Sequence, residues 1–143
     1  KGLLPVAVAT YLGVGEAGRA LVAVAAFSGH LYPCFLEFRG GKGVATALGV
    51  LLGLAPLGMA VAVPTFLLAV AVTRYVSLGS ILAAAVTPAV LAAFGYPLPT
   101  TLVALVMGVW IAFRHRDNIR RMRCGTESRV GGRPSTFPDS GYA

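Results

Sequence analysis

Residues 44–72 read VATALGVLLGLAPLGMAVAVPTFLLAVAV, an apolar stretch without a charged side chain. One helix of this length would extend about 43 Å, which exceeds the roughly 30 Å hydrocarbon core of a bilayer. Pro56 and Gly58 stand near the middle of the stretch, and this pairing is typical of a turn. The stretch therefore predicts two short membrane helices joined by a turn at Pro56.

The rest of the chain divides in the same way. Residues 3–27 are apolar but are interrupted by the glycine-rich stretch 13–18, and residues 78–94 and 98–113 are each close to the length of one span. These segments predict an all-α, polytopic integral membrane protein. We expect six short transmembrane helices, at residues 2–14, 17–29, 43–56, 58–73, 77–95 and 98–114.

The composition agrees with a membrane protein. The chain has 143 residues, of which 57% are hydrophobic and 12% charged, a mean hydropathy of +0.79 and a net charge of +7. A soluble domain carries about 25% charged residues, so a disordered chain or a water-soluble globule is not expected. A nucleic-acid partner is not expected either, because an apolar chain leaves little soluble surface for the basic charge.

The placement of charge supports the count of six helices. With six spans, every Lys and Arg except Arg19 falls on one side of the membrane, which the positive-inside rule assigns to the cytoplasm. Treating residues 44–72 as one span would move the Arg-rich tail to the other side. We expect residues 1–128 to form a single transmembrane domain and the polar, Gly/Pro-rich residues 129–143 to form a disordered cytoplasmic tail.

The first loop on the basic side contains a candidate phosphate site. It reads GHLYPCFLEFRGGKGVAT over residues 29–46, and Gly40, Gly41, Lys42 and Gly43 come directly before a predicted helix. Backbone N–H groups, a helix N-terminus and a lysine charge together bind phosphate well. Gly43 stands where a Walker A loop has Ser or Thr, so nucleotide hydrolysis is not supported. The alternative is a flexible basic loop that only anchors to lipid headgroups.

Two further regions on this side carry polar groups. Ser77 and Ser80 stand at a helix start, where one could cap the helix and the other could direct its hydroxyl into a site. If the last helix continues, His115 and Asn118 share one face, as a general base and a group that stabilises charge. The plainer readings are capping for the serines and a juxtamembrane basic helix for residues 114–127. A structural role is the simpler interpretation of His30.

These motifs resemble the bacterial acyl-phosphate–glycerol-3-phosphate acyltransferases, the PlsY family. Residues 29–46 resemble the second motif of that family, and residues 115–127 resemble its third motif through His115, Asn118, Arg121 and Glu127. Arg74-Tyr75-Val76-Ser77-Leu78 resembles the intervening loop. The resemblance covers residue 1 to about residue 127.

The resemblance implies transfer of a fatty acyl group from acyl phosphate to the 1-hydroxyl of glycerol 3-phosphate, which gives lysophosphatidate and phosphate in phospholipid biosynthesis. It implies a seven-helix fold in the bacterial cytoplasmic (inner) membrane, with the active site on the cytoplasmic side and membrane lipids as partners. His115 and Asn118 would be catalytic, and Glu127, His30 and Thr46 structural. The substrate-binding residues would be Arg39, Gly40, Gly41, Lys42, Gly43, Ser77 and Ser80.

Several expectations qualify this assignment. The first helix and first motif of the family have no counterpart in these residues, so we expect an N-terminally truncated chain. Neither a cofactor nor a metal is expected, and Cys34 and Cys124 are expected to be free thiols. The rival class is a small membrane transporter or an assembly subunit with a basic cytoplasmic face.

Overall fold

The protein is described here by a computed structural model that covers residues 1–32 and 41–131. Within these residues all regular structure is helical. The helices are α1 (Leu3–Tyr11), α2 (Glu16–Leu31), α3 (Val44–Leu54), α4 (Pro56–Thr73), α5 (Val76–Ala93), α6 (Leu98–Arg114) and α7 (Arg116–Arg123). The all-α fold class is therefore confirmed for the described part of the chain.

The predicted break at Pro56 is confirmed. Helix α3 ends at Leu54 and α4 begins at Pro56, which occupies the first helical position, where a missing N–H costs no hydrogen bond. The other predicted turn is also present, since Gly13 adopts a φ of +70° between α1 and α2. Each of the six predicted helices has a counterpart within a few residues of its expected bounds.

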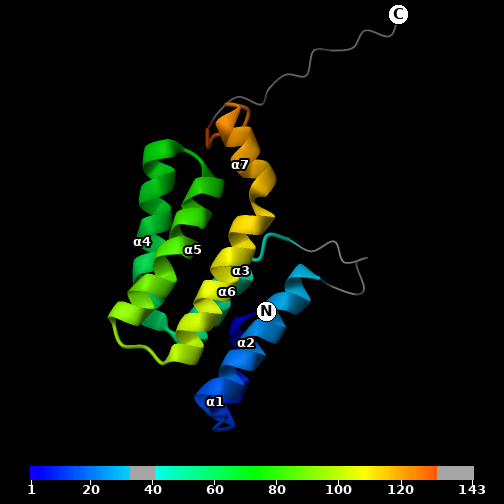
Figure 1. Cartoon of the computed structure of the whole chain (residues 1–143), viewed down its shortest axis with the longest axis vertical. Coiled ribbons are helices and arrows are strands. Elements are labelled where there is room, and N and C mark those ends of the chain that lie inside the picture. Colours follow the sequence, from blue (N-terminus) through cyan, green and yellow to red (C-terminus); the bar gives the residue numbers. More distant parts are fainter. Residues whose placement is uncertain (33–40, 132–143) are drawn as a thin grey trace, which may run out of the picture.

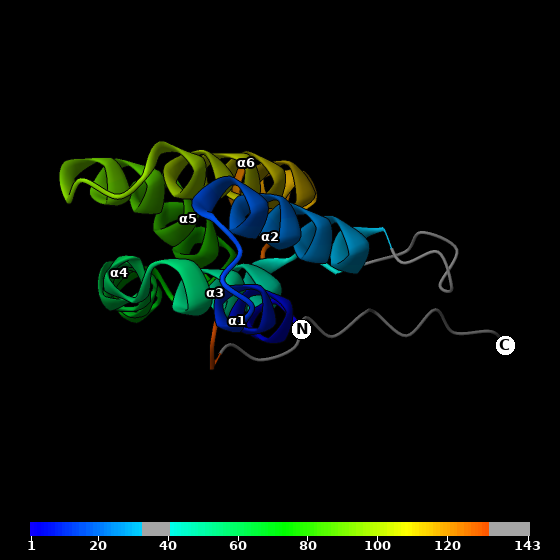
Figure 2. The ribbon, with the colours of Figure 1, turned by 90° about the horizontal axis from the view of Figure 1, so that it is seen from below.

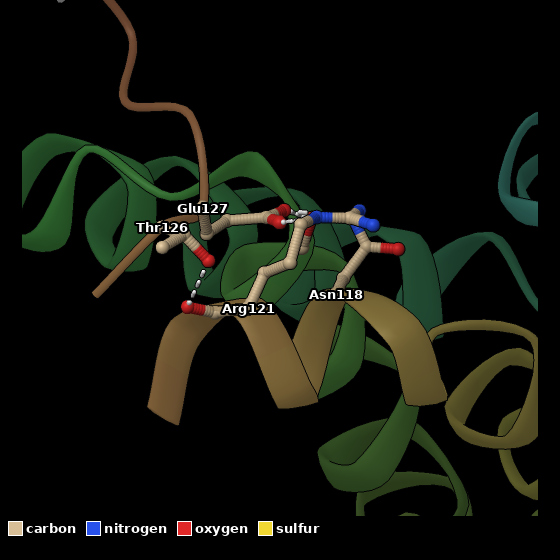
Figure 3. Close-up of polar contacts among 5 residues, drawn as sticks. Asn118, Arg121, Thr126 and Glu127 are labelled. Atoms are coloured by element: carbon tan, nitrogen blue, oxygen red, sulfur yellow. Dashed lines mark hydrogen bonds and ion pairs between the residues drawn. The ribbon is translucent and has the colours of Figure 1, made fainter. Parts of the chain in front are cut away.

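The last predicted helix, at residues 98–114, has the same bounds as α6. It does not continue straight through His115, because α7 leaves it at an angle of 53°. The condition under which His115 and Asn118 would share one continuous helical face is therefore not met. Asn118 instead lies on α7 and is directed toward α5 (Figure 3).

The helices form two layers, as Figure 2 shows. Helices α1, α3 and α4 lie in one layer and α2 and α6 in the other, while α5 packs along both α4 and α6. Buried apolar side chains fill the space between the layers. The largest of them are Phe27, Leu31, Leu91 and Met107. The α4–α5 turn and α7 lie at the same end of the bundle (Figure 1).

The outer surface of the bundle is apolar. Leu4, Leu68 and Val72 are 70%, 67% and 75% exposed, and many other large hydrophobic residues are exposed too. A surface of this kind suits lipid rather than water. By length and apolarity, α4 and α5 can each cross a membrane, and a third span results if the bent pair α6 and α7 counts as one. This measure gives two or three spans in the described residues, fewer than the six predicted.

Candidate active site

The start of α3 is shaped by Gly43. This residue has a φ of +83°, a left-handed conformation that side chains other than glycine rarely adopt. A Cβ at this position would lie 2.7 Å from the ring of Phe27 and 3.1 Å from Leu31, so α2 also leaves no space for one. The close approach brings the N-terminus of α3, with its free N–H groups, against the end of α2. Lys42 lies directly before it.

His30 lies beside this glycine-rich segment. A Cβ on Gly41 would be 3.2 Å from His30 Nε2, so the imidazole is packed against the Gly41 backbone. Thr46 is buried in the first turn of α3. Arg39 and Gly40, which we predicted to bind substrate, lie outside the described residues.

The N-terminus of α3 faces a pocket, the polar pocket, which five segments of the chain line together. Its residues are His30, Lys42, Gly43, Val44, Ala45, Leu48, Phe66, Val76, Ser77, Ser80 and His115. The pocket brings together predicted residues from each of the three basic-side regions, even though they are up to 85 positions apart in the sequence. It therefore offers a lysine, a helix N-terminus, two hydroxyls and an imidazole to one bound molecule.

An apolar cavity lies next to the polar pocket. Its lining comes from α3, α4, α5 and α6 and is apolar apart from Ser80 and Thr87. It shares Val44, Leu48, Phe66 and Ser80 with the polar pocket. Ser80 stands at this border, and its hydroxyl donates to the carbonyl of Val76 at 3.0 Å. The two spaces together suit an amphiphile, with its charged end near Lys42 and its hydrocarbon part between the helices.

His115 is held in one orientation at the α6–α7 bend. His115 is only 2% exposed, and its Nδ1 lies 2.7 Å from the carbonyl oxygen of Ile111. Because a carbonyl can only accept, Nδ1 carries the proton and Nε2 of the neutral ring is an acceptor. Burial lowers the pKa of His115, and the charge of Lys42 lowers it further, against the opposing effects of the Ile111 hydrogen bond and the Glu127 charge. A neutral imidazole with a free Nε2 lone pair is able to take a proton.

Behind the polar pocket, Ser77 belongs to a buried hydrogen-bond network with Asn118 and Glu127 (Figure 3). The Ser77 hydroxyl donates to Glu127 Oε1 at 2.5 Å, and Asn118 Nδ2 lies 2.8 Å from Ser77 Oγ and 2.6 Å from Glu127 Oε1. Arg121 Nε donates to Glu127 Oε2 at 2.8 Å. The network joins α5, α7 and the segment after α7.

The charge state of Glu127 follows from these partners. Burial acts to raise its pKa, but the hydrogen bonds from Asn118, Ser77 and Arg121 and the charge of Arg121 lower the pKa to about 2. Glu127 is therefore a carboxylate at neutral pH, and it accepts from all three donors. Neither serine caps α5, which begins without a side-chain cap.

Sequence reasoning did not foresee how these groups are divided. Ser77, Ser80 and His115 line the polar pocket, whereas Asn118 and Glu127 reach it through Ser77. The pairing of Arg121 with Glu127 also went unforeseen, because the sequence does not show which of the several arginines near Glu127 reaches its carboxylate. Within residues 1–32 and 41–131, no group of three His, Cys, Asp or Glu side chains is arranged to hold a metal ion.

Comparison with known proteins identifies relatives of this chain. The family profile described as glycerol-3-phosphate acyltransferase matches residues 1–125. A glycerol-3-phosphate acyltransferase of Geobacter sulfurreducens is 52% identical over 129 residues, which cover 90% of this chain and 66% of the relative. One from Sinorhizobium fredii is 50% identical over 132 residues, which cover 92% and 63%. The chain thus spans slightly less than two thirds of these relatives.

Two solved structures are similar to this one. Both are crystal structures of PlsY (YgiH), an integral membrane glycerol 3-phosphate acyltransferase, in a glycerol 3-phosphate form and a lysophosphatidic acid form. Each has a TM-score of 0.86 and 38% sequence identity, and the match covers 91% of this chain. It covers 66% of the chain in the first structure and 67% in the second.

Proposed function

The chain belongs to the glycerol-3-phosphate acyltransferase family, and from this premise we propose that it transfers a fatty acyl group from acyl phosphate to glycerol 3-phosphate. The observation that carries the proposal is the polar pocket, where Lys42 and the α3 N-terminus face His115 beside an apolar cavity. The products would be lysophosphatidate and inorganic phosphate. The relatives are named for the acceptor glycerol 3-phosphate, and the basic end of the pocket at Lys42 supports this acceptor.

The roles of the residues follow from their chemistry. Lys42 and the backbone at Gly41 and Gly43 would bind a phosphate group, together with Arg39 and Gly40. Ser77 would contact the substrate in the polar pocket, and Ser80 would do so where this pocket meets the apolar cavity. Hydrocarbon of the acyl donor would occupy that cavity, because its lining offers almost no polar partner.

In the reaction, the 1-hydroxyl oxygen of glycerol 3-phosphate attacks the acyl carbonyl carbon. The new ester C–O bond forms, the bond from that carbon to the phosphate oxygen breaks, and phosphate leaves. The hydroxyl proton passes to Nε2 of neutral His115 or to a phosphate oxygen of the substrate. Asn118, held by Glu127, keeps Ser77 in position and stabilises charge beside the pocket. His30 and Thr46 would support the phosphate-binding segment.

The membrane arrangement is part of the proposal. The helices α1 to α6 would each traverse or enter the membrane, with thinning, tilt and interfacial end residues compensating for the short ones. The basic residues at the end that carries α7 favour a cytoplasmic active site in the bacterial inner membrane. Residues 1–128 would form one catalytic domain, with a cytoplasmic tail from residue 129.

The test is reconstitution of the protein in lipid vesicles with acyl phosphate and glycerol 3-phosphate. Phosphate release and a lysophosphatidate product are expected only when both substrates are present. Phosphate release that ignores glycerol 3-phosphate, or no release at all, would refute the proposal. Efflux of a trapped anion without any ester product would instead support the transporter class.

A further inference from the structure

The turn between α4 and α5 contains a residue in an unusual conformation. Arg74 has a φ of +63° and a ψ of +13°. No other non-glycine residue among those described has a positive φ. The left-handed region is unfavourable for a side chain with a Cβ, and a glycine would adopt it without strain. The contacts of the arginine side chain must therefore offset the cost of this backbone conformation.

The side chain and backbone of Arg74 both bind the segment that follows α7. The N–H of Val130 donates to the Arg74 carbonyl at 2.9 Å, and Arg74 Nε donates to the Val130 carbonyl at 2.8 Å. Tyr75 and Arg129, the residues adjacent to Arg74 and Val130, form a second contact. Arg129 Nε donates to the Tyr75 hydroxyl at 3.0 Å, and the Arg129 guanidinium lies 5.0 Å from the centre of the Tyr75 ring.

This contact, which we name the Arg74 clamp (Arg74, Tyr75, Arg129 and Val130), is close to the buried network. Ser77 is three residues after Arg74, and Glu127 is three residues before Val130. The segment after α7 is thus attached at two points, through Glu127 to the first turn of α5 and through Val130 to the α4–α5 turn. A three-residue link can extend no more than about 11 Å, so the second attachment restricts where Glu127 can move.

We propose that Arg74 is a positioning residue for the acyl-transfer site: it holds residues 129–131 so that Glu127 stays on Ser77 and Asn118. This inference rests on the proposed function for its catalytic consequence, but not for the clamp itself. Arg129 and Val130 lie beyond residue 125, where the family match ends.

The decisive measurement is amide hydrogen exchange of peptides covering residues 124–131 in the reconstituted protein. Arg74→Gly keeps the left-handed backbone and removes only the side chain. It should raise exchange of this segment about fivefold, the effect of one net hydrogen bond. Arg74→Lys retains a donor and should stay within about twofold of the unchanged protein.

A matched pair of variants tests the other side of the clamp. Val130→Pro removes the N–H that binds the Arg74 carbonyl, whereas Val130→Ala keeps that N–H and trims only an exposed side chain. Val130→Pro should raise exchange of residues 124–129, and Val130→Ala should not. In the double variant of Arg74→Gly and Val130→Pro, the fold increase in exchange rate should be smaller than the product of the fold increases in the two single variants. The reason is that both substitutions remove the same contact.

Kinetics distinguish positioning from simple stabilisation. Arg74→Gly should lower kcat about fivefold and leave the KM for glycerol 3-phosphate within about twofold, and Arg74→Lys should recover most of kcat. Unchanged exchange in Arg74→Gly would overturn the clamp, and raised exchange with an unchanged kcat would overturn its positioning role. If the unsubstituted protein releases no phosphate, the proposed function fails, while the exchange data still decide whether Arg74 holds the segment.

Discussion

Replacing Glu127 with glutamine should loosen the end of the bundle that carries α7 more than any other single acid-to-amide change in the described chain. The Glu127 side chain is 5% exposed, and it accepts charge-assisted hydrogen bonds from Ser77 and Asn118, two buried donors. Each such bond contributes about 1.5–3 kcal/mol, and a glutamine oxygen keeps part of one. The Arg121 side chain is 48% exposed, so its ion pair with Glu127 contributes little, because water can solvate the guanidinium when the carboxylate is removed. We therefore expect Glu127→Gln to destabilise the attachment of residues 124–131 by about 2–4 kcal/mol.

Hydrogen exchange of residues 124–131 and thermal unfolding in detergent would measure this loss. Asp117→Asn is the matched control, because it makes the same chemical change on an exposed residue of α7. That control should shift stability by no more than about 0.5 kcal/mol. Equal effects of the two substitutions would refute the argument that the buried network, rather than local net charge, holds the segment.

The pH dependence of the Glu127→Gln effect supplies a second check. The pKa of Glu127 is lowered from its ordinary 4.5 to about 2, so the folded state favours the carboxylate. Its stabilising contribution is therefore fully present above about pH 4.5 and is lost as the pH falls toward 2. The stability difference between the unsubstituted protein and Glu127→Gln should be constant from pH 5 to 7 and should narrow below pH 4.5.

Three further predictions concern the polar pocket. His115→Gln should lower kcat by about 100-fold or more if Nε2 takes the proton, and an unchanged turnover would exclude that role. Lys42→Gln should raise the KM for glycerol 3-phosphate about tenfold or more. The Lys42 charge lowers the pKa of His115, so its removal in Lys42→Gln should raise that pKa and move the acidic limb of the pH–rate profile to higher pH. Gly43→Ala should destabilise the protein by about 2–4 kcal/mol in thermal unfolding, through strain and the clash with Phe27. Gly95→Ala, with a φ of +70° but open space, should show the smaller effect of strain alone.

Much of the fold could be read from local patterns in the sequence. The apolar runs predicted six helices near their observed bounds, and Pro56 predicted the α3–α4 break, because proline lacks the N–H that a helix interior needs. The glycine-rich segment before α3 could likewise be recognised as a candidate anion site from local sequence. Its features, namely glycines, a lysine and a helix start, are neighbours along the chain. The resemblance to the acyltransferase family was readable in the same residues, and the comparisons confirm the family.

The tertiary structure decided what local patterns leave open. The 53° bend at His115 removes the alignment of His115 and Asn118 that a continuous helix would give. Asn118 instead donates a hydrogen bond to Ser77, 41 positions away in the sequence. Glu127 likewise meets Ser77 across 50 positions. Such contacts depend on how whole helices pack and on the angle between α6 and α7, and neither is encoded in the spacing of any one segment. The sequence by itself determined the helices, their apolar surfaces and the chemical groups of the site. Packing alone decided that Ser77, Asn118 and Glu127 meet, and that Arg74 adopts a left-handed conformation to hold Val130.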